Sequence, residues 1–223
     1  MTGTRLLDLF CGAGGAAVGY HRAGFDVVGV DIAPQPRYPF EFHQGDAMTW
    51  PLDGFDAIHA SPVCLGWARV TAWRGDRARY PDQIAATRER LEAAGLPWVI
   101  ENVSEAPLRP DMILCGSQFG LTVRRHRVFE TSWRAFDLMP PCDHRGLRPF
   151  MHKDERAYAD AMGCTWMNKT EARQAIPPAY TEYVGRPLLA ALERAVGAAL
   201  LTLPAVLRPP QPGLTRQEVG DCG

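Results

Sequence analysis

The first thirty residues contain a strand, a glycine turn, a helix and a second strand, and this order strongly restricts the fold. Residues 5–10 form a short apolar run with one acid, which is typical of a buried parallel strand. A glycine-rich turn follows at 11–15, and the small residues over 16–23 predict a helix that ends at Gly24. Residues 26–31 give the second strand. The succession predicts an α/β fold with a parallel sheet.

The glycine turn and the acids at the strand ends indicate a ligand that contains a nucleoside. Glycines let a ligand approach the backbone closely, and Asp31, at the tip of the second strand, can accept hydrogen bonds from a ribose. Asp46 follows a predicted strand at 40–44. Its carboxylate could contact an adenine amino group, or Asp46 could instead be a structural residue of a turn or a helix cap. A dinucleotide and a nucleoside with a charged amino-acid tail both remain open.

A cysteine lies where chemistry is expected in such a sheet. The predicted strand at 56–60 stops at Pro62, which leaves Cys64 on a loop at the carboxyl edge. A thiolate is a strong nucleophile, although an arbitrary cysteine is more often a buried structural residue. The predicted strand at 96–100 ends in Glu101, so a carboxyl group is expected at the same edge. A partly apolar cleft would raise its pKa and suit proton donation.

Arginine is concentrated in two stretches. The loop at 65–83 interleaves arginines with aromatic residues, a pattern that suits phosphates and stacked bases and equally suits a polar surface loop or a lid. The second stretch, 124–127, lies between strands at 112–116 and 127–131 that are predicted to pair antiparallel. Because the formal net charge is -1, a nucleic-acid site must come from such local clusters.

The rest of the chain is predicted to be helical around one irregular stretch at 132–154. Helices are expected over 83–94, 155–162, 169–174 and 181–201, and the last one carries an apolar stripe at Leu188, Leu192, Val196 and Leu200.

The sequence predicts reduced thiols and no metal site. The six cysteines are scattered without a Cys-x-x-Cys pair. Cys142 and His144, with His152 or Cys164, could ligate a metal, but loop residues without that role are the more common outcome. The sequence also lacks a signal-peptide pattern at its start and an apolar stretch near the ~20 residues of a membrane span, so a cytoplasmic location is expected.

Five motifs, in order, resemble those of the cytosine-5 DNA methyltransferases. Residues 8–15, Asp-Leu-Phe-Cys-Gly-Ala-Gly-Gly, resemble the first motif of that family. Residues 62–68, Pro-Val-Cys-Leu-Gly-Trp-Ala, are similar to its Pro-Cys-Gln-Gly-Phe-Ser nucleophile motif, with Leu65 in place of Gln. Residues 101–103 match its Glu-Asn-Val motif.

Two later motifs complete the resemblance, which runs from about residue 5 to 190. Phe119-Gly120 and Arg125-His126-Arg127 resemble the Gln-x-Arg-x-Arg motif, with Val123 where Gln is usual. Residues 174–178, Gln-Ala-Ile-Pro-Pro, resemble the final Gly-Asn-x-x-Pro-Pro motif, with Gln for Asn. About thirty irregular residues stand where the family has its target-recognition domain.

The resemblance implies a Rossmann-like class I methyltransferase sheet with helices on both faces and a small irregular appendage. It implies an S-adenosylmethionine-binding catalytic domain at 1–131, a reduced target-recognition region at 132–165, returning helices at 166–203 and a flexible tail at 204–223. The implied cofactor is S-adenosylmethionine, and the implied cofactor-binding residues are Phe10, Gly12, Gly14, Asp31, Ile32, Asp46 and Pro62.

The implied activity is methyl transfer to carbon 5 of a cytosine flipped out of duplex DNA, by a monomer of restriction-modification or phage type. In this mechanism Cys64 attacks carbon 6, Glu101 protonates or hydrogen-bonds ring nitrogen 3, and Arg125 holds the base oxygen with Arg127 beside it. Two alternatives remain: the same chemistry on RNA or a free cytosine nucleotide, and a catalytically silent nucleic-acid-binding protein. Arginines expected to contact nucleic acid are Arg69, Arg74, Arg77 and Arg124.

Overall fold

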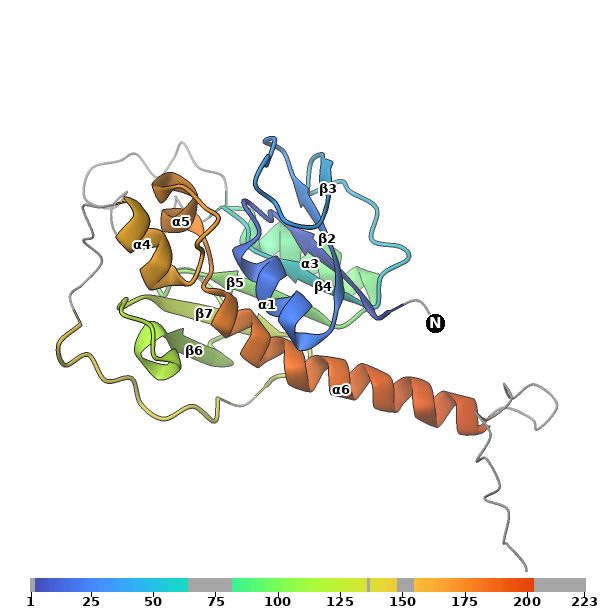
Figure 1. Ribbon diagram of the computed structural model, residues 1–223. Helices are drawn as coiled ribbons and strands as arrows, with labels where there is room; N and C mark the ends of the chain where they lie inside the picture. The colour runs from blue at the N-terminus through green and yellow to red at the C-terminus, as the bar shows by residue number, and fades with distance from the viewer. Residues whose placement is uncertain (1–2, 64–81, 136, 148–154, 203–223) are drawn as a thin grey trace, which may run out of the picture. The chain divides into compact units, whose positions relative to one another are not determined.

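The computed structural model describes residues 3–63, 82–135, 137–147 and 155–202. Their centre is a seven-stranded sheet of order β3-β2-β1-β4-β5-β7-β6 (Figure 1). Among the described strands only β7 runs against the others, because it pairs antiparallel with both β5 and β6. The predicted antiparallel pair is therefore confirmed. The strands are β1 Arg5–Leu9, β2 Asp26–Asp31, β3 Glu41–Gln44, β4 Ala57–Ala60, β5 Trp98–Asn102, β6 Met112–Cys115 and β7 His126–Thr131.

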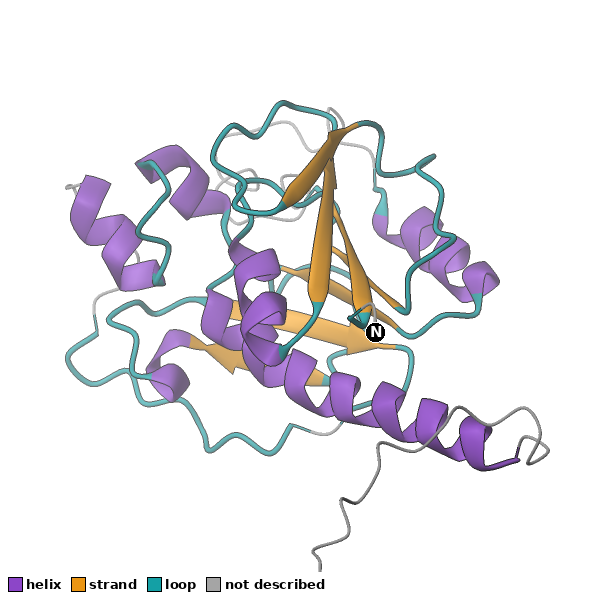
Figure 2. Ribbon diagram, turned by 45° about the vertical axis from the view of Figure 1, so that its right-hand side comes forward, coloured by secondary structure: helices purple, strands orange, loops and turns teal. Residues whose placement is uncertain are grey.

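The central strands are apolar because helices cover both sides of the sheet. In Figures 1 and 2, α1 (Gly15–Ala23) and α3 (Ile84–Ala94) lie on opposite faces. Leu7 on β1 stands opposite Val28 on one side and Ile58 on the other, and all three are buried. Double coverage of this kind is what near-continuous apolar strands require.

The chain reverses its direction of travel across the sheet between β1 and β4. From β1 it proceeds outward to β2 and β3, and then returns to place β4 on the other side of β1. In open α/β sheets a ligand binds at the carboxyl ends of the strands beside such a switch point.

Helix α1 approaches α6 (Pro178–Thr202) closely because both helices carry glycine at the contact. The Thr181 hydroxyl donates to the Ala16 carbonyl over 2.8 Å. A Cβ atom on Gly19 would lie 2.0 Å from Thr181 Oγ1 and 2.1 Å from the Pro178 carbonyl oxygen, so a larger side chain does not fit. This contact fixes the glycine turn relative to the C-terminal segment.

The burial of the apolar stripe predicted for the last helix differs between two of its members. Leu188 is buried, whereas Val196 is 60% exposed. The chain divides after Leu189 into two compact units, and residues 190–202 of the second unit continue the helix. No described helix is both long enough and apolar enough to cross a membrane.

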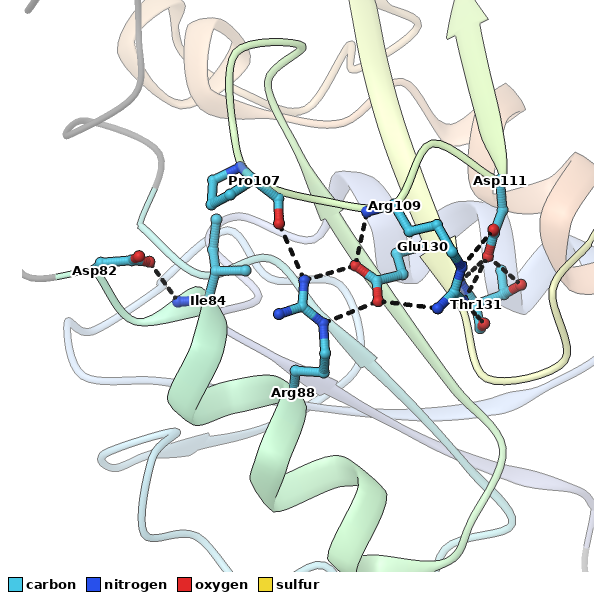
Figure 3. A network of polar contacts seen from close by, with 8 residues as sticks. All are labelled: Asp82, Ile84, Arg88, Pro107, Arg109, Asp111, Glu130 and Thr131. Carbon is cyan, nitrogen blue, oxygen red and sulfur yellow. Dashed lines mark hydrogen bonds and ion pairs between the residues drawn. The ribbon is translucent and has the colours of Figure 1, made fainter.

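A buried carboxylate on β7 connects α3 to the sheet (Figure 3). Glu130 accepts two hydrogen bonds from the Arg88 guanidinium, at 2.9 and 2.7 Å, and a third from the Arg109 backbone N–H at 3.1 Å. A buried carboxylate needs such partners to offset the loss of hydration. The same hydrogen bonds raise the pKa of Arg88, which stays charged.

Candidate active site

A cavity of about 390 Å³ opens at the carboxyl ends of the parallel strands. Its volume lies within the range of small-molecule sites. Residues that follow β1, β2 and β4 form one part of its wall, and residues near the end of α5 (Lys169–Gln174) form another. The position agrees with the switch point between β1 and β4.

The turn after β1 is held open by the acid at the end of β2. The Gly12 N–H donates to Asp31 Oδ2 over 3.0 Å, and the Ala33 N–H donates to Oδ1 over 2.9 Å. Gly12 and Gly14 have positive φ angles of 48° and 85°, and Phe10 is also left-handed at 59°. Phe10 pays a steric cost for this conformation that a glycine would avoid. A carboxylate has further lone pairs, so Asp31 can still accept hydrogen bonds from a ligand.

Most residues predicted to bind the cofactor line this cavity. Gly14 does not: it caps α1, and an added Cβ would lie 2.8 Å from Pro39 Cδ. A glycine is needed at position 14 because the backbone has a positive φ and because the segment before β3 packs closely against it. The predicted cofactor residues that line the cavity are Phe10, Gly12, Asp31, Ile32, Asp46 and Pro62.

Two features of the cavity wall indicate that it holds a ligand. Ile32 lines the cavity and is 73% exposed, which leaves an apolar side chain for a ligand to cover. Gln83 Oε1 is buried at the same wall and has no hydrogen-bond partner among the residues that the structure describes. A buried acceptor without a partner is costly, and a ligand that donates a hydrogen bond would remove this cost.

Glu101 and Arg127 form a buried ion pair in the wall of the cavity. Arg127 Nε lies 2.7 Å from Glu101 Oε1, and their side chains are 11% and 5% exposed. The contact lacks hydrogen-bond geometry, so Oε1 keeps an unsatisfied hydrogen-bonding position. Burial raises the pKa of Glu101, and the charges of Arg127 and Arg125 oppose this shift without cancelling it. The site therefore favours the proton on Glu101 more than water does.

Arg125 lies behind this pair and does not line the cavity. It is 6% exposed, and its Nη2 donates to the Arg173 carbonyl over 2.8 Å. Burial lowers its pKa to about 10, which still leaves it charged at neutral pH. Its backbone carbonyl accepts a hydrogen bond from the Tyr180 hydroxyl at 2.6 Å, so the residue before strand β7 is joined to α6. Arg124, the predicted nucleic-acid contact beside it, is exposed.

The segment after β4 is fixed up to the residue before Cys64. The Asn102 amide donates to the Pro62 carbonyl over 2.8 Å, and Ser61, Pro62 and Val63 line the cavity. Buried His59 joins Tyr20 to Ser61 by hydrogen bonds of 3.0 and 2.8 Å. Burial lowers the pKa of His59 to about 3, so it bridges them as a neutral ring. The predicted nucleophile Cys64 and the predicted nucleic-acid contacts Arg69, Arg74 and Arg77 lie outside the described residues.

The C-terminal segment supplies part of the wall that the sequence did not predict. Glu171, Gln174 and Ile176 line the cavity, and Arg37 pairs with Glu171 over 2.8 Å. Trp166 donates its indole N–H to the Ala13 carbonyl over 2.9 Å. The Gln-Ala-Ile-Pro-Pro motif, which begins at Gln174, is the sequence feature that could have pointed to these residues. The motif alone did not indicate that they line the cavity.

No family model and no characterised protein matches this chain by sequence. The fold is similar to that of the S. pombe Dnmt2 methyltransferase, with a TM-score of 0.52, 14% identity, and coverage of 86% of this chain and 99% of that chain. This likeness shows the fold, a Rossmann-like class I methyltransferase sheet.

The structural neighbours also include an E. coli prophage-encoded protein described as a DNA modification methyltransferase. Its TM-score is 0.44, with 21% identity, and the match covers 70% of this chain and 54% of that one. The present chain thus spans about half of that protein's length. A Salinibacter ruber RNA methyltransferase in complex with S-adenosyl-L-homocysteine matches with a TM-score of 0.36, 15% identity, and coverage of 62% and 84% of the two chains.

Proposed function

We propose that this protein transfers a methyl group from S-adenosylmethionine to carbon 5 of cytosine in DNA. The observation that carries the proposal is one shared cavity. The glycine turn, Asp31, the Glu101–Arg127 pair and the residues leading directly into Cys64 all line it.

The cavity fits the proposed cofactor in its donor set and its surfaces. The Asp31 carboxylate can accept the ribose hydroxyls, and Asp46 or the unpartnered Gln83 oxygen can accept an adenine amino group. Ile32 offers an apolar surface to the face of the adenine ring. The bound cofactor supplies an electrophilic methyl group on a sulfonium.

The protein's own groups suit the activation of a cytosine ring. Carbon 5 is a weak nucleophile, and attack of the Cys64 thiolate on carbon 6 would make it enamine-like. Negative charge then moves toward ring nitrogen 3. Glu101, whose pKa is raised by burial, can donate a proton or a hydrogen bond there. Release of the carbon-5 proton to a base and departure of Cys64 restore the aromatic ring.

Arg127 and Arg125 have different proposed roles. Arg127 lines the cavity and pairs with Glu101, so it can also donate a hydrogen bond to the base oxygen. The sequence resemblance implied that Arg125 holds the base oxygen, but Arg125 is buried and does not line the cavity. Its proposed role is to contribute positive charge near Glu101 and to position the start of β7. Because the reacting face of a base is hidden in a duplex, the target must be flipped into this cavity.

RNA is the second candidate substrate. The segment between β7 and α4 (Glu155–Met162) is short, and its described residues, 132–135 and 137–147, contain neither helix nor strand. It offers little surface for reading a long DNA sequence in the major groove, whereas unpaired bases need no groove readout.

Transfer of labelled methyl groups to duplex DNA, RNA and dCMP in parallel tests the proposal. We expect incorporation into DNA, a covalent adduct on DNA that carries 5-fluorocytosine, and loss of both by several orders of magnitude in Cys64→Ser. Cys222→Ser is the same substitution outside every motif and should behave like the wild type. Cofactor binding by Cys64→Ser, measured by calorimetry, shows that the variant is folded. Near-normal turnover by Cys64→Ser would refute the covalent route, and incorporation confined to RNA would establish the second candidate.

A further inference from the structure

Four metal-binding side chains meet at the edge of the sheet formed by β6 and β7. Cys115 ends β6 and His126 begins β7, and these two residues stand directly opposite each other in the antiparallel register. Cys142 and His144 come from the segment that follows β7. The two sulfur atoms and two ring nitrogens all lie within 4.8 Å of one another.

The distances between these atoms agree with a tetrahedral zinc site. Cys115 Sγ lies 3.4 Å from His144 Nε2, and His126 Nε2 lies 3.5 Å from Cys142 Sγ. Zinc bonds of about 2.3 Å to sulfur and about 2.0–2.1 Å to nitrogen place neighbouring sulfur and nitrogen ligands about 3.6 Å apart in a tetrahedron. The rings of His126 and His144 are nearly perpendicular, at 81°, so both can present a nitrogen to one centre without stacking.

The chemistry of the four ligands selects the metal. Two thiolates and two imidazoles suit Zn²⁺, whereas Mg²⁺ and Ca²⁺ prefer oxygen ligands. Both cysteines are free thiols rather than a disulfide. The Ser117 hydroxyl donates toward Cys115 Sγ over 3.6 Å, which is the kind of outer hydrogen bond that supports a ligating thiolate.

We propose that Cys115, His126, Cys142 and His144 bind one structural Zn²⁺ ion, against the sequence expectation of no metal. Four protein ligands leave no open position for a substrate, and none of the four lines the cavity. The ion would fasten the segment after β7 to the end of the β6–β7 pair (Figure 1).

Among the described residues, few other contacts join that segment to the sheet. Gln118 donates from its amide to the Pro140 carbonyl over 2.7 Å, and the Ile113 N–H donates to Asp137 Oδ2 over 3.2 Å. The segment's described residues form no regular element. An irregular segment that lacks its own core commonly depends on a metal or disulfide for its conformation.

The metal content of the purified protein tests this proposal. We expect about one zinc per chain by elemental analysis. In Cys142→Ser and in His144→Gln, binding should weaken at least 10-fold in competition with a chromogenic chelator. Cys164→Ser and His43→Gln are matched controls, because these residues lie elsewhere in the fold, and should retain full zinc. Protein reconstituted with Co²⁺ should show the intense ligand-field bands of a tetrahedral site with thiolate charge transfer.

Three outcomes would overturn the proposal. Wild-type protein could remain free of zinc after incubation with excess Zn²⁺ and dialysis. Zinc content could be unchanged in Cys142→Ser and His144→Gln. A Cys115–Cys142 disulfide could be found by mass spectrometry in freshly purified, unreduced protein. The wild-type measurements stand even where a variant fails to fold, and a chelator should lower the melting temperature of the wild type but not that of a folded Cys142→Ser.

Discussion

The side-chain amide of Asn102 holds the segment that leads to Cys64, the proposed nucleophile. The substitution Asn102→Asp removes the N–H donor of this amide and keeps the oxygen acceptor. Asn102 is 1% exposed. Its Nδ2 donates to the Pro62 carbonyl over 2.8 Å, and its Oδ1 accepts from the Val103 N–H over 2.9 Å. The introduced carboxyl group has nearly the same shape and keeps the second hydrogen bond. The first becomes a contact between two oxygens unless the carboxyl group is protonated.

The expected loss follows from this geometry. Leaving the Pro62 carbonyl without its donor costs about 1–3 kcal/mol. The new carboxyl group must also lose hydration as an anion or keep its proton at a cost of about 1.4 kcal/mol for each pH unit above its ordinary pKa. We therefore expect Asn102→Asp to lower the free energy of unfolding by about 3 kcal/mol at pH 7. The loss should shrink toward pH 5, because a protonated carboxyl group can again donate to Pro62.

Urea unfolding from pH 5 to pH 8 measures this difference, and Asn168→Asp provides the control. The Asn168 side chain caps α5 by accepting from the Glu171 N–H over 2.9 Å, a role that aspartate fills equally well. The control should stay within about 0.5 kcal/mol of the wild type. Equal unfolding free energies for the two variants at pH 7 would show that the Asn102–Pro62 hydrogen bond does not hold the segment before Cys64.

Two further substitutions test the packing and the charge of the site. Gly19→Ala should lower the free energy of unfolding by about 1–3 kcal/mol, because the added Cβ would lie 2.1 Å from the Pro178 carbonyl oxygen, although alanine is the better helix former. Arg22→Ala, at an exposed position of the same helix, is the control. A Gly19→Ala variant that is more stable than the wild type would contradict the close α1–α6 contact. The raised pKa of Glu101 means that the folded protein holds this proton more tightly than the unfolded chain does. The contribution of Glu101 to stability therefore declines as the pH rises from 4.5, the ordinary pKa of the side chain, through the raised pKa. The difference in unfolding free energy between wild type and Glu101→Gln should change with pH in that window, and a difference that is constant with pH would contradict the shift.

The regular elements were predictable where local pattern determines them. Strand β2 and helices α4 and α5 have the predicted bounds, because apolar runs, caps and breakers act over a few residues. Helix α6 begins at Pro178, three residues before the prediction, since proline is tolerated in a first turn. Glu101 lies inside β5 rather than after it, because pairing with β7 extends the strand to Asn102.

The cavity was predictable in its strand-end residues and not in the rest. Parallel strands end at one edge of a sheet, so Asp31, Asp46 and Pro62 could be placed together from sequence order alone. Glu171 and Gln174 reach the same cavity through the packing of α5, and no local pattern encodes that contact. Arg125 and Arg127 were both predicted to act on the base, but only Arg127 lines the cavity, whereas Arg125 donates to the Arg173 carbonyl.

The proposed zinc ligands could not be grouped from their spacing in the sequence alone. Cys142 and His144 were considered as ligands together with His152 or Cys164. Cys164 instead packs in a separate apolar cluster, and His152 lies outside the described residues. The partners that the structure brings to them, Cys115 and His126, are far apart in sequence and become neighbours only through the antiparallel register of β6 and β7. A one-residue slip of that register would turn His126 to the opposite face. Zinc binding would therefore report on strand pairing, and loss of zinc from a variant that shifts β7 would indicate a register change before any loss of helix content.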